Sequence, residues 1–357
     1  MQNRRVFLAG AAGWSSVAAL GLMHGRAGAA TLAVVSENEL IAKVDPSVWV
    51  SWGKGTFPNA QGATDKNLAG FLQVGFQYHT FSLVPYALVH RNAHFMDGAC
   101  LVAEYAFAHQ RADGSFPYSE SNAAESSGAP INPASPASTL TLFYYDLGHS
   151  LLVLAKDDWY LHSAECAPFR ARIDALRPKI GRSLDWLLTQ RSLLATDKAA
   201  SNRTLAHGLA FYLVGQALGR SDAVAAGSEI VSGALDKVEN GVFPEAGGFD
   251  SSYQAVNVLE CEWLALHATD AALRDRLWSA IQTGLARERT AMLPTGEVST
   301  KGNTRISATG ETYFGHRKTV NSGQVMLAFA YYGVMANDSP ATDTAAKIQQ
   351  FYGLPTK

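Results

Sequence analysis

Residues 240–267, NGVFPEAGGFDSSYQAVNVLECEWLALH, contain the pattern that decides the fold. An Asn-Gly turn and a Phe-Pro pair come first, and apolar residues at helical spacing follow from Gln254 to His267. The same order of turn and aromatic-proline pair occurs in DGSFPY at 113–118, and PTGEV at 294–298 is a weaker copy. Because a helix, a turn, a short extended piece and another helix recur at long, irregular intervals, we expect repeated helical hairpins.

Apolar residues at helical spacing run along most of the chain, whereas alternating, strand-like stretches are brief. The spacing predicts helices over 65–75, 93–110, 140–156, 168–190, 205–218, 223–238, 254–267, 271–285 and 322–335. Repeated hairpins favour a mainly α protein, with a complete or incomplete (α/α) toroid in a single catalytic domain of residues 30–357. The alternative, an open helical solenoid, would show a tighter repeat of about 30 to 50 residues.

One long segment, 119–138, has no helical periodicity and is dominated by Ser, Asn, Ala, Pro and Gly. We expect a long loop there. Long ordered loops in compact domains commonly form the lid or the wall of a binding cleft, and a flexible insertion is the alternative.

The N-terminus has the pattern of an export signal. Arg4 and Arg5 precede Phe-Leu, an apolar stretch rich in Ala and Gly extends to Met23, and Ala27-Gly28-Ala29 supplies a small-x-small cleavage pattern. We predict a twin-arginine signal peptide over residues 1–29 and a mature protein that is periplasmic or secreted. A membrane anchor is the alternative, but glycines dilute the stretch and it lacks the run of about 20 bulky apolar residues that spans a bilayer.

Charge and composition exclude several classes of protein. The net charge is -2, and acidic and basic residues are interspersed, so no electrostatic surface for nucleic acid or for an anionic membrane is predicted. The three cysteines lie far apart in apolar surroundings and are expected to be buried thiols. There is no GxSxG, dinucleotide, HExxH or paired CxxC motif, and His90 and His94 alone are weak evidence for a metal. We therefore expect no cofactor and no metal site.

Polar residues that suit catalysis cluster at the starts of two predicted helices. SNRTLAH at 201–207 places Asn202 before a helix and His207 in its first turns. GGFDSSYQ at 247–254 places Tyr253 beside a glycine-rich backbone, where a phenol can act as a general acid or base if neighbouring cations lower its pKa. The plainer interpretation is that the histidine is structural and that the Asp and Ser residues are helix caps.

A third polar segment, 301–318, is rich in basic and aromatic residues. Arg305 or Arg317 can bind a carboxylate through paired hydrogen bonds, and Tyr313 offers a ring for stacking on a sugar. This segment suits a carboxylate-bearing sugar chain. The alternative is a solvated basic loop.

Asn202, His207, Tyr253 and Arg305 together resemble the catalytic set of helical-toroid polysaccharide lyases of the Tyr/His/Asn/Arg type, such as glucuronan and alginate lyases. The resemblance implies β-elimination on a uronic acid polymer, in which Asn202 and Arg305, with His207 as a further candidate, neutralise the carboxylate. Tyr253 protonates the leaving oxygen, and either Tyr253 or His207 abstracts the C5 proton. The implied partner is an acidic polysaccharide, and the implied substrate-binding residues are Arg203, Gln254, Tyr313, His149 and Arg317.

Two other functions remain open. A glycoside hydrolase on the same fold needs two carboxylates across the scissile bond, and Asp113, Glu245, Asp250 and Glu297 lie in suitable loops. Asp250→Asn is the discriminating variant, since near-complete loss of activity favours the hydrolase and mild loss the lyase. A periplasmic sugar-binding protein without catalysis is the other possibility, and binding without turnover would reveal it.

Overall fold

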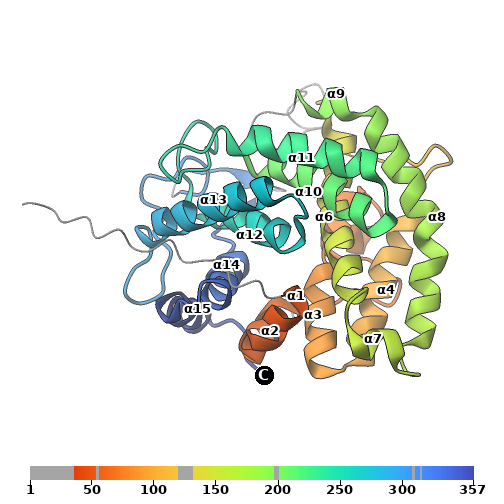
Figure 1. Ribbon diagram of the computed structural model, residues 1–357, viewed down its shortest axis with the longest axis horizontal. Helices are drawn as coiled ribbons and strands as arrows, with labels where there is room; N and C mark the ends of the chain where they lie inside the picture. Colours follow the sequence, from red (N-terminus) through yellow and green to blue (C-terminus); the bar gives the residue numbers. More distant parts are fainter. Residues whose placement is uncertain (1–35, 54–55, 120–131, 197–200, 308–309, 314–315) are drawn as a thin grey trace, which may run out of the picture. The chain divides into compact units, whose positions relative to one another are not determined.

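The computed structural model describes residues 36–53, 56–119, 132–196, 201–307, 310–313 and 316–357, which all belong to one compact unit. The predicted export signal (1–29) and most of the predicted long loop (119–138) lie outside the described residues. Figure 1 shows a mainly helical chain, which confirms that the protein is mainly α. Among the described residues, no helix combines the length and the apolar character needed to cross a membrane.

The helical elements are α1 (Glu37–Lys43), α2 (Pro46–Gly53), η2 (Asp65–Ala69), η3 (Val74–Gln77), α3 (Thr80–His90), α4 (Ala93–Ala108), α6 (Ser135–Leu154), α7 (Asp158–His162), α8 (Ala167–Thr189), α9 (Arg191–Leu194), α10 (Ser201–Leu218), α11 (Ser221–Leu235), α12 (Ser251–His267), α13 (Ala271–Arg289), α14 (Ser322–Met335) and α15 (Ser339–Phe351). Two short strands, β1 (Thr312–Tyr313) and β2 (His316–Arg317), pair antiparallel. The cysteines are buried free thiols, as predicted.

One predicted helix is wrong. Residues 65–75 form two separate 3-10 turns instead, because Gly70 between them takes φ +131, a conformation that cannot continue a helix. The helix α3 was not predicted from the sequence because it is apolar on nearly every side and contains Pro85. The other predicted helices are present, with ends shifted by a few residues.

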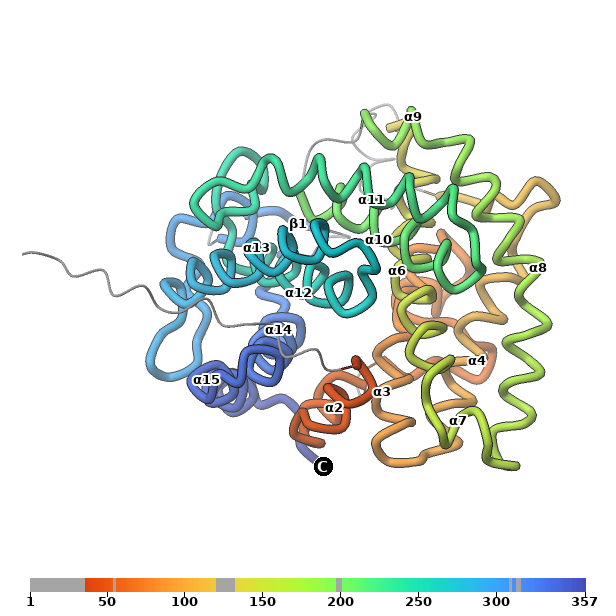
Figure 2. Tube along the Cα trace, in the orientation of Figure 1, coloured from red at the N-terminus to blue at the C-terminus, as the bar shows by residue number. Residues whose placement is uncertain are grey.

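Two sets of helices differ in burial. The helices α2, α3, α6, α10, α12 and α14 each contact the next in this order, and α14 contacts α2 again (Figure 2). Residues on nearly every side of α12 and α14 are buried, as expected for helices enclosed by others. The helices α4, α8, α11, α13 and α15 pack outside this set, and α8, α13 and α15 bury only one stripe each.

The recurring turns predicted from the sequence share a structural role. Gly241 takes φ +75, and a Cβ at this position would lie 2.3 Å from the carbonyl oxygen of Thr283 in α13. Gly114 and Gly296 approach the backbone of α8 and α15 in the same way. Only glycine fits such contacts, so each turn is held against an outer helix that follows it in the chain.

Gln254 reinforces one of these turns. Its side-chain Nε2 donates to the carbonyl oxygens of Gly241, at 2.7 Å, and of Gly284, at 3.1 Å, while its Oε1 accepts from the backbone of Phe243. Gln77 makes the equivalent contacts earlier in the chain, to Gly62 and to α4. The side chain of Gln254 therefore belongs to the framework of the fold.

A buried carboxylate joins α1 to three inner helices. Glu37 accepts hydrogen bonds from Nε2 of His149 (2.5 Å), from Nε2 of His267 (2.6 Å) and from the hydroxyl of Tyr331 (2.9 Å). Burial by itself would raise the pKa of Glu37, but the charge and hydrogen bonds of the two histidines lower it to about 2. Glu37 is therefore a buried anion, and His149 serves as one of its donors.

Candidate functional site

The starts of several inner helices meet at one cavity of about 330 Å³. Its wall contains the first turns of α10, α12 and α14, together with a face of α6 and the segment 65–78. The residues that line it are Asp65, Lys66, Gln73, Gly75, Phe76, Tyr78, Thr139, Leu142, Tyr145, Asn202, Arg203, Tyr253, Val256, Glu260, Arg305, Lys318, Asn321 and Gln324. Helix N-termini carry partial positive charge, and the buried carboxylates of Glu245 and Asp250 accept hydrogen bonds from the first N–H groups of α10 and α12.

Tyr253 lies in the wall of this cavity between two cations. Asp250 caps α12 and fixes its start, which places Tyr253 in the first helical turn. The guanidinium carbon of Arg305 lies 4.0 Å from the centroid of the Tyr253 ring, and Lys318 Nζ donates to the Tyr253 hydroxyl at 3.3 Å. Tyr253 therefore has a hydroxyl that is hydrogen-bonded to an ammonium group and a ring that stacks against a guanidinium group.

Arg305 is bound by two carboxylates. Its Nε and Nη2 donate to the two oxygens of Glu311, at 3.0 and 3.1 Å, and its Nη1 donates to Glu245 at 2.9 Å. Lys318 also binds Glu311, at 2.7 Å. The hydrogen bonds from Arg305, with those from Lys318, lower the pKa of Glu311 to about 2. Glu311 thus binds Arg305, which the sequence assigned to a substrate carboxylate, and also Lys318 beside it.

Asn202 lies on the opposite side of this network. Its backbone N–H donates to Glu245 at 3.0 Å, and Ser201 donates its hydroxyl to the same oxygen of Glu245. The side chain lines the cavity, and its Oδ1 is buried without a hydrogen-bond partner. Glu245 therefore couples the start of α10 to Arg305 and holds Asn202 in the wall.

His207 and Arg203 meet at Ser138. Arg203 lines the cavity, and its Nη1 donates to the hydroxyl oxygen of Ser138 at 3.2 Å, which is also 3.2 Å from Nε2 of His207. His207 is buried and does not line the cavity, and it borders a separate pocket beside α9 and α11. The structure therefore brings Asn202, Arg203, Tyr253 and Arg305 together and leaves His207 behind this wall.

The other predicted substrate-binding residues are divided. Arg317 lines a second cavity of about 280 Å³, which shares Tyr253, Lys318 and the start of α14 with the first. Tyr313 belongs to the short hairpin beside it. Gln254 and His149 are fully buried and bonded within the fold, so neither faces the cavity.

The four loop carboxylates considered for a hydrolase do not line the cavity. Asp250 is fully buried and accepts backbone hydrogen bonds from Ser252, Tyr253, Arg305 and Ile306. A substitution of Asp250 would therefore disturb the start of α12 whichever reaction is catalysed, and Asp250→Asn does not discriminate between the two.

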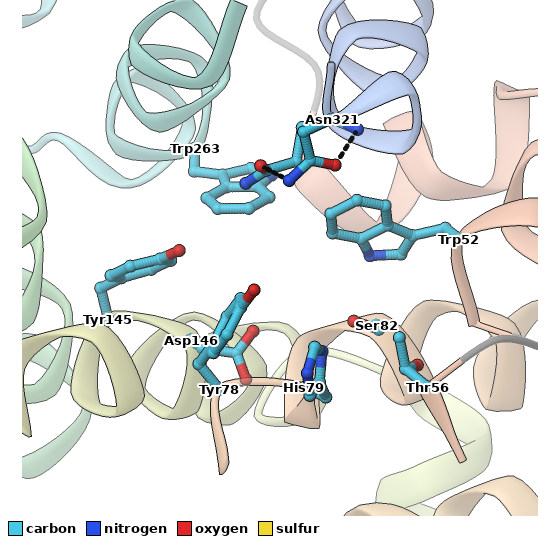
Figure 3. A pocket seen from close by; sticks show the side chains of 10 residues that line it. Trp52, Thr56, Tyr78, His79, Ser82, Tyr145, Asp146, Trp263 and Asn321 are labelled. Carbon is cyan, nitrogen blue, oxygen red and sulfur yellow. Dashed lines mark hydrogen bonds between the residues drawn. The ribbon is translucent and has the colours of Figure 1, made fainter. Parts of the chain in front are cut away.

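An aromatic pocket of about 110 Å³ adjoins the main cavity, with which it shares Tyr78, Tyr145, Asn321 and Gln324. Trp52 and Trp263 lie on the opposite side of this pocket from Tyr78 (Figure 3). Rings of this kind offer faces for sugar stacking. Three features of this site are absent from the predicted set: Lys318, Glu260 and the aromatic group. Two of them have a signal in the sequence. Lys318 stands in the basic segment, and Glu260 follows Tyr253 by seven residues, on the same face of a helix.

Among the described residues, one group of potential metal ligands is close enough to share an ion: Glu37, His149 and His267. Their ligand atoms are in direct hydrogen-bond contact at 2.5 and 2.6 Å. Ligands of a tetrahedral zinc ion stand about 3.3 Å apart, given bonds of about 2.0 Å. The present geometry is therefore that of a hydrogen-bonded carboxylate.

In comparisons with known proteins, no family model matches this sequence, and no curated protein is similar enough to show a relationship. The function is therefore argued from the site itself.

Proposed function

We propose that this protein is a polysaccharide lyase that cleaves a uronic acid polymer, of the glucuronan or alginate type, by β-elimination. The observation that carries the proposal is the position of Tyr253, whose hydroxyl accepts a hydrogen bond from Lys318 and whose ring lies under Arg305. Asn202 and Arg203 line the same cavity, so an amide and a further cation lie beside the space that a substrate carboxylate would occupy.

The chemistry follows from these positions. A base removes the C5 proton beside the carboxylate, the electrons of that bond form the C4–C5 double bond, and the C4–O bond breaks as the leaving oxygen is protonated. We assign both proton transfers to Tyr253, because it lines the cavity and its hydroxyl is hydrogen-bonded to the ammonium group of Lys318. The side-chain amide of Asn202 and the guanidinium of Arg203 stabilise the charge that develops on the carboxylate, as do the helix N-termini.

Two residues in the predicted catalytic set take modified roles in this proposal. Arg305 stacks on the ring of Tyr253 and is bound by Glu311. It would bind a substrate carboxylate only after its hydrogen bonds to Glu311 break. His207 acts through Ser138 and Arg203 as a positioning residue, since it does not line the cavity.

We also propose the (α/α) toroid for the architecture. The cycle of contacts from α2 through α3, α6, α10, α12 and α14 back to α2 supports it, as do the outer helices α4, α8, α11, α13 and α15. The export signal over residues 1–29 and a periplasmic or secreted location complete the proposal, and they fit an enzyme that meets large acidic polysaccharides.

The test is to incubate the mature protein with glucuronan, alginate and a neutral glucan while following both the absorbance of unsaturated uronate and new reducing ends. A rise of both signals on a uronate polymer supports the lyase. Reducing ends without the absorbance would point to a hydrolase, and binding without either would point to a sugar-binding protein.

The matched variants are Tyr253→Phe and Tyr105→Phe. Removing the Tyr253 hydroxyl should lower kcat by about 100-fold or more, in the range of general acid and base catalysis. Tyr105 does not line the cavity, and its variant should retain activity. A Tyr253→Phe variant with near-normal kcat would refute the assignment.

A further inference from the structure

Glu260 lies on the same face of α12 as Tyr253. Tyr253, Val256 and Glu260 all line the main cavity, and their spacing of three and then four residues keeps them on one side of the helix. Seven residues of helix rise by about 10 Å, so Glu260 stands deeper in the cavity than the tyrosine.

One carboxyl oxygen of Glu260, Oε2, has no hydrogen-bond partner among the described residues. The residue is 2 % exposed, its Oε2 is buried without a hydrogen bond, and no ion pair reaches it from the described residues. Leaving a buried polar group unpaired costs about 1 to 3 kcal/mol, so an apolar side chain would be the more stable choice at this position. A group of this kind at a cavity is a candidate for contact with a ligand.

Burial raises the pKa of Glu260 well above its ordinary value, and the nearby charge of Glu245 raises it further. This direction of shift favours the protonated form, which can donate one hydrogen bond. Glu262 and Glu288 are also buried with unpaired oxygens, but they do not line the main cavity or the two cavities that adjoin it. Glu260 differs from Glu262 and Glu288 because it lines the main cavity.

We infer that Glu260 binds the carboxylate of a uronate residue at the floor of the cavity, with its own carboxylic acid group as the hydrogen-bond donor. The inference rests on the proposed lyase function and names a specificity-determining residue for it. A hydrogen bond from an acid to a carboxylate is charge-assisted and about twice as strong as one to a neutral hydroxyl. Glu260 would thus favour an acidic polymer over a neutral glucan.

The test compares Glu260→Gln, which keeps the shape and an N–H donor, with Glu260→Leu, which has neither donor nor acceptor. Glu260→Leu should raise KM for the uronate polymer by about tenfold or more, equivalent to about 1.4 kcal/mol of binding, with a smaller change in kcat. Glu260→Gln should recover most of the lost affinity. Glu262→Leu, in the same helix and equally buried, is the control for effects on folding and should leave KM unchanged.

Binding of a short oligoglucuronate, measured by calorimetry in a Tyr253→Phe background, gives a readout that does not depend on turnover. The inference is wrong if Glu260→Leu binds as well as its parent, and also if Glu260→Gln is as inactive as Glu260→Leu, because the group would then take part in the chemistry. If the unmodified protein cleaves no uronate polymer, the proposed function is wrong and this inference falls with it. Cleavage with an unaffected Glu260→Leu variant overturns this inference alone.

Discussion

Replacing Glu37 by glutamine should destabilise the whole fold, although this residue lies outside the cavity. The carboxylate is fully buried and accepts three hydrogen bonds, from His149, His267 and Tyr331. Glutamine keeps the shape, but it removes the charge and turns one acceptor into a donor. One histidine must then change tautomer or lose its hydrogen bond.

Two lines of reasoning, both based on the hydrogen bonds of Glu37, give the size of the loss in stability. Hydrogen bonds to a charged group contribute about 1 kcal/mol more than neutral ones, which gives about 3 kcal/mol for three bonds. The pKa of Glu37 falls from 4.5 to about 2, and this change corresponds to about 3 kcal/mol of stability by linkage. At about 2 cal/mol/K per residue over roughly 330 residues, the loss lowers Tm by about 4 to 5 °C.

The pH dependence supplies a second signature. Because the folded pKa of Glu37 lies below the unfolded value, its contribution is complete above about pH 4.5 and is lost as the pH falls towards 2. Burial lowers the pKa of His149, so stability also falls as the pH drops below the ordinary histidine value. Glu37→Gln should flatten the part of the curve below pH 4.5.

The assay is thermal unfolding followed by circular dichroism, from pH 7 to pH 3. Glu229→Gln is the control, since Glu229 forms an exposed ion pair with Arg191 and should change Tm by no more than about 1 °C. Glu37 does not have this role if Glu37→Gln melts within 1 °C of the parent at pH 7, or if Tm depends on pH below pH 4.5 in the same way in both proteins.

Three further results are expected. Glu311→Gln should weaken the hold on the two cations beside Tyr253 and lower KM for the polymer several-fold at low salt, and an unchanged or higher KM would contradict this. Lys318→Met should lower kcat by about 10- to 100-fold with less effect on KM, whereas a kcat within about threefold of the parent would exclude its role. Gly241→Ala should lower the free energy of urea unfolding by at least about 3 kcal/mol, because its Cβ meets backbone atoms. Gly247→Ala, where a Cβ has open space, is the control and should lower it by about 1 to 2 kcal/mol. Equal losses would count against the close contact at Gly241.

Much of the fold follows from helical periodicity, which is strong wherever a helix has one buried stripe. The exceptions have physical reasons: Pro85 interrupts the apolar sequence of α3, and the buried stripe of α15 consists largely of small alanines within a polar sequence. The segment 65–75 has helical spacing, but Gly70 divides it. The closed order of helix contacts depends on long-range packing, which no local pattern specifies.

The site was predictable where its residues stand at helix starts. Asn202 and Tyr253 lie in the first turns of two helices that begin at the same cavity, so position along the chain was sufficient. His207 follows Asn202 by five residues, a rotation of about 140° around the helix, and therefore faces away. Gln254 and His149 were misleading because a buried polar residue can serve the framework as well as a ligand. Arg305 pairs with Glu311 six residues later in the same loop, and residue spacing alone does not reveal this pairing.

The glycine turns have a consequence for how the chain comes apart. Three glycines contact the backbone of an outer helix that follows them in the chain: Gly114, Gly241 and Gly296. The contacts are so close that a Cβ atom would not fit. Each turn follows an outer helix and contacts the outer helix of the next hairpin, so it connects two hairpins that are consecutive in the chain. Local opening of one outer helix should therefore expose the glycine turn of the preceding hairpin to solvent, which hydrogen exchange can detect.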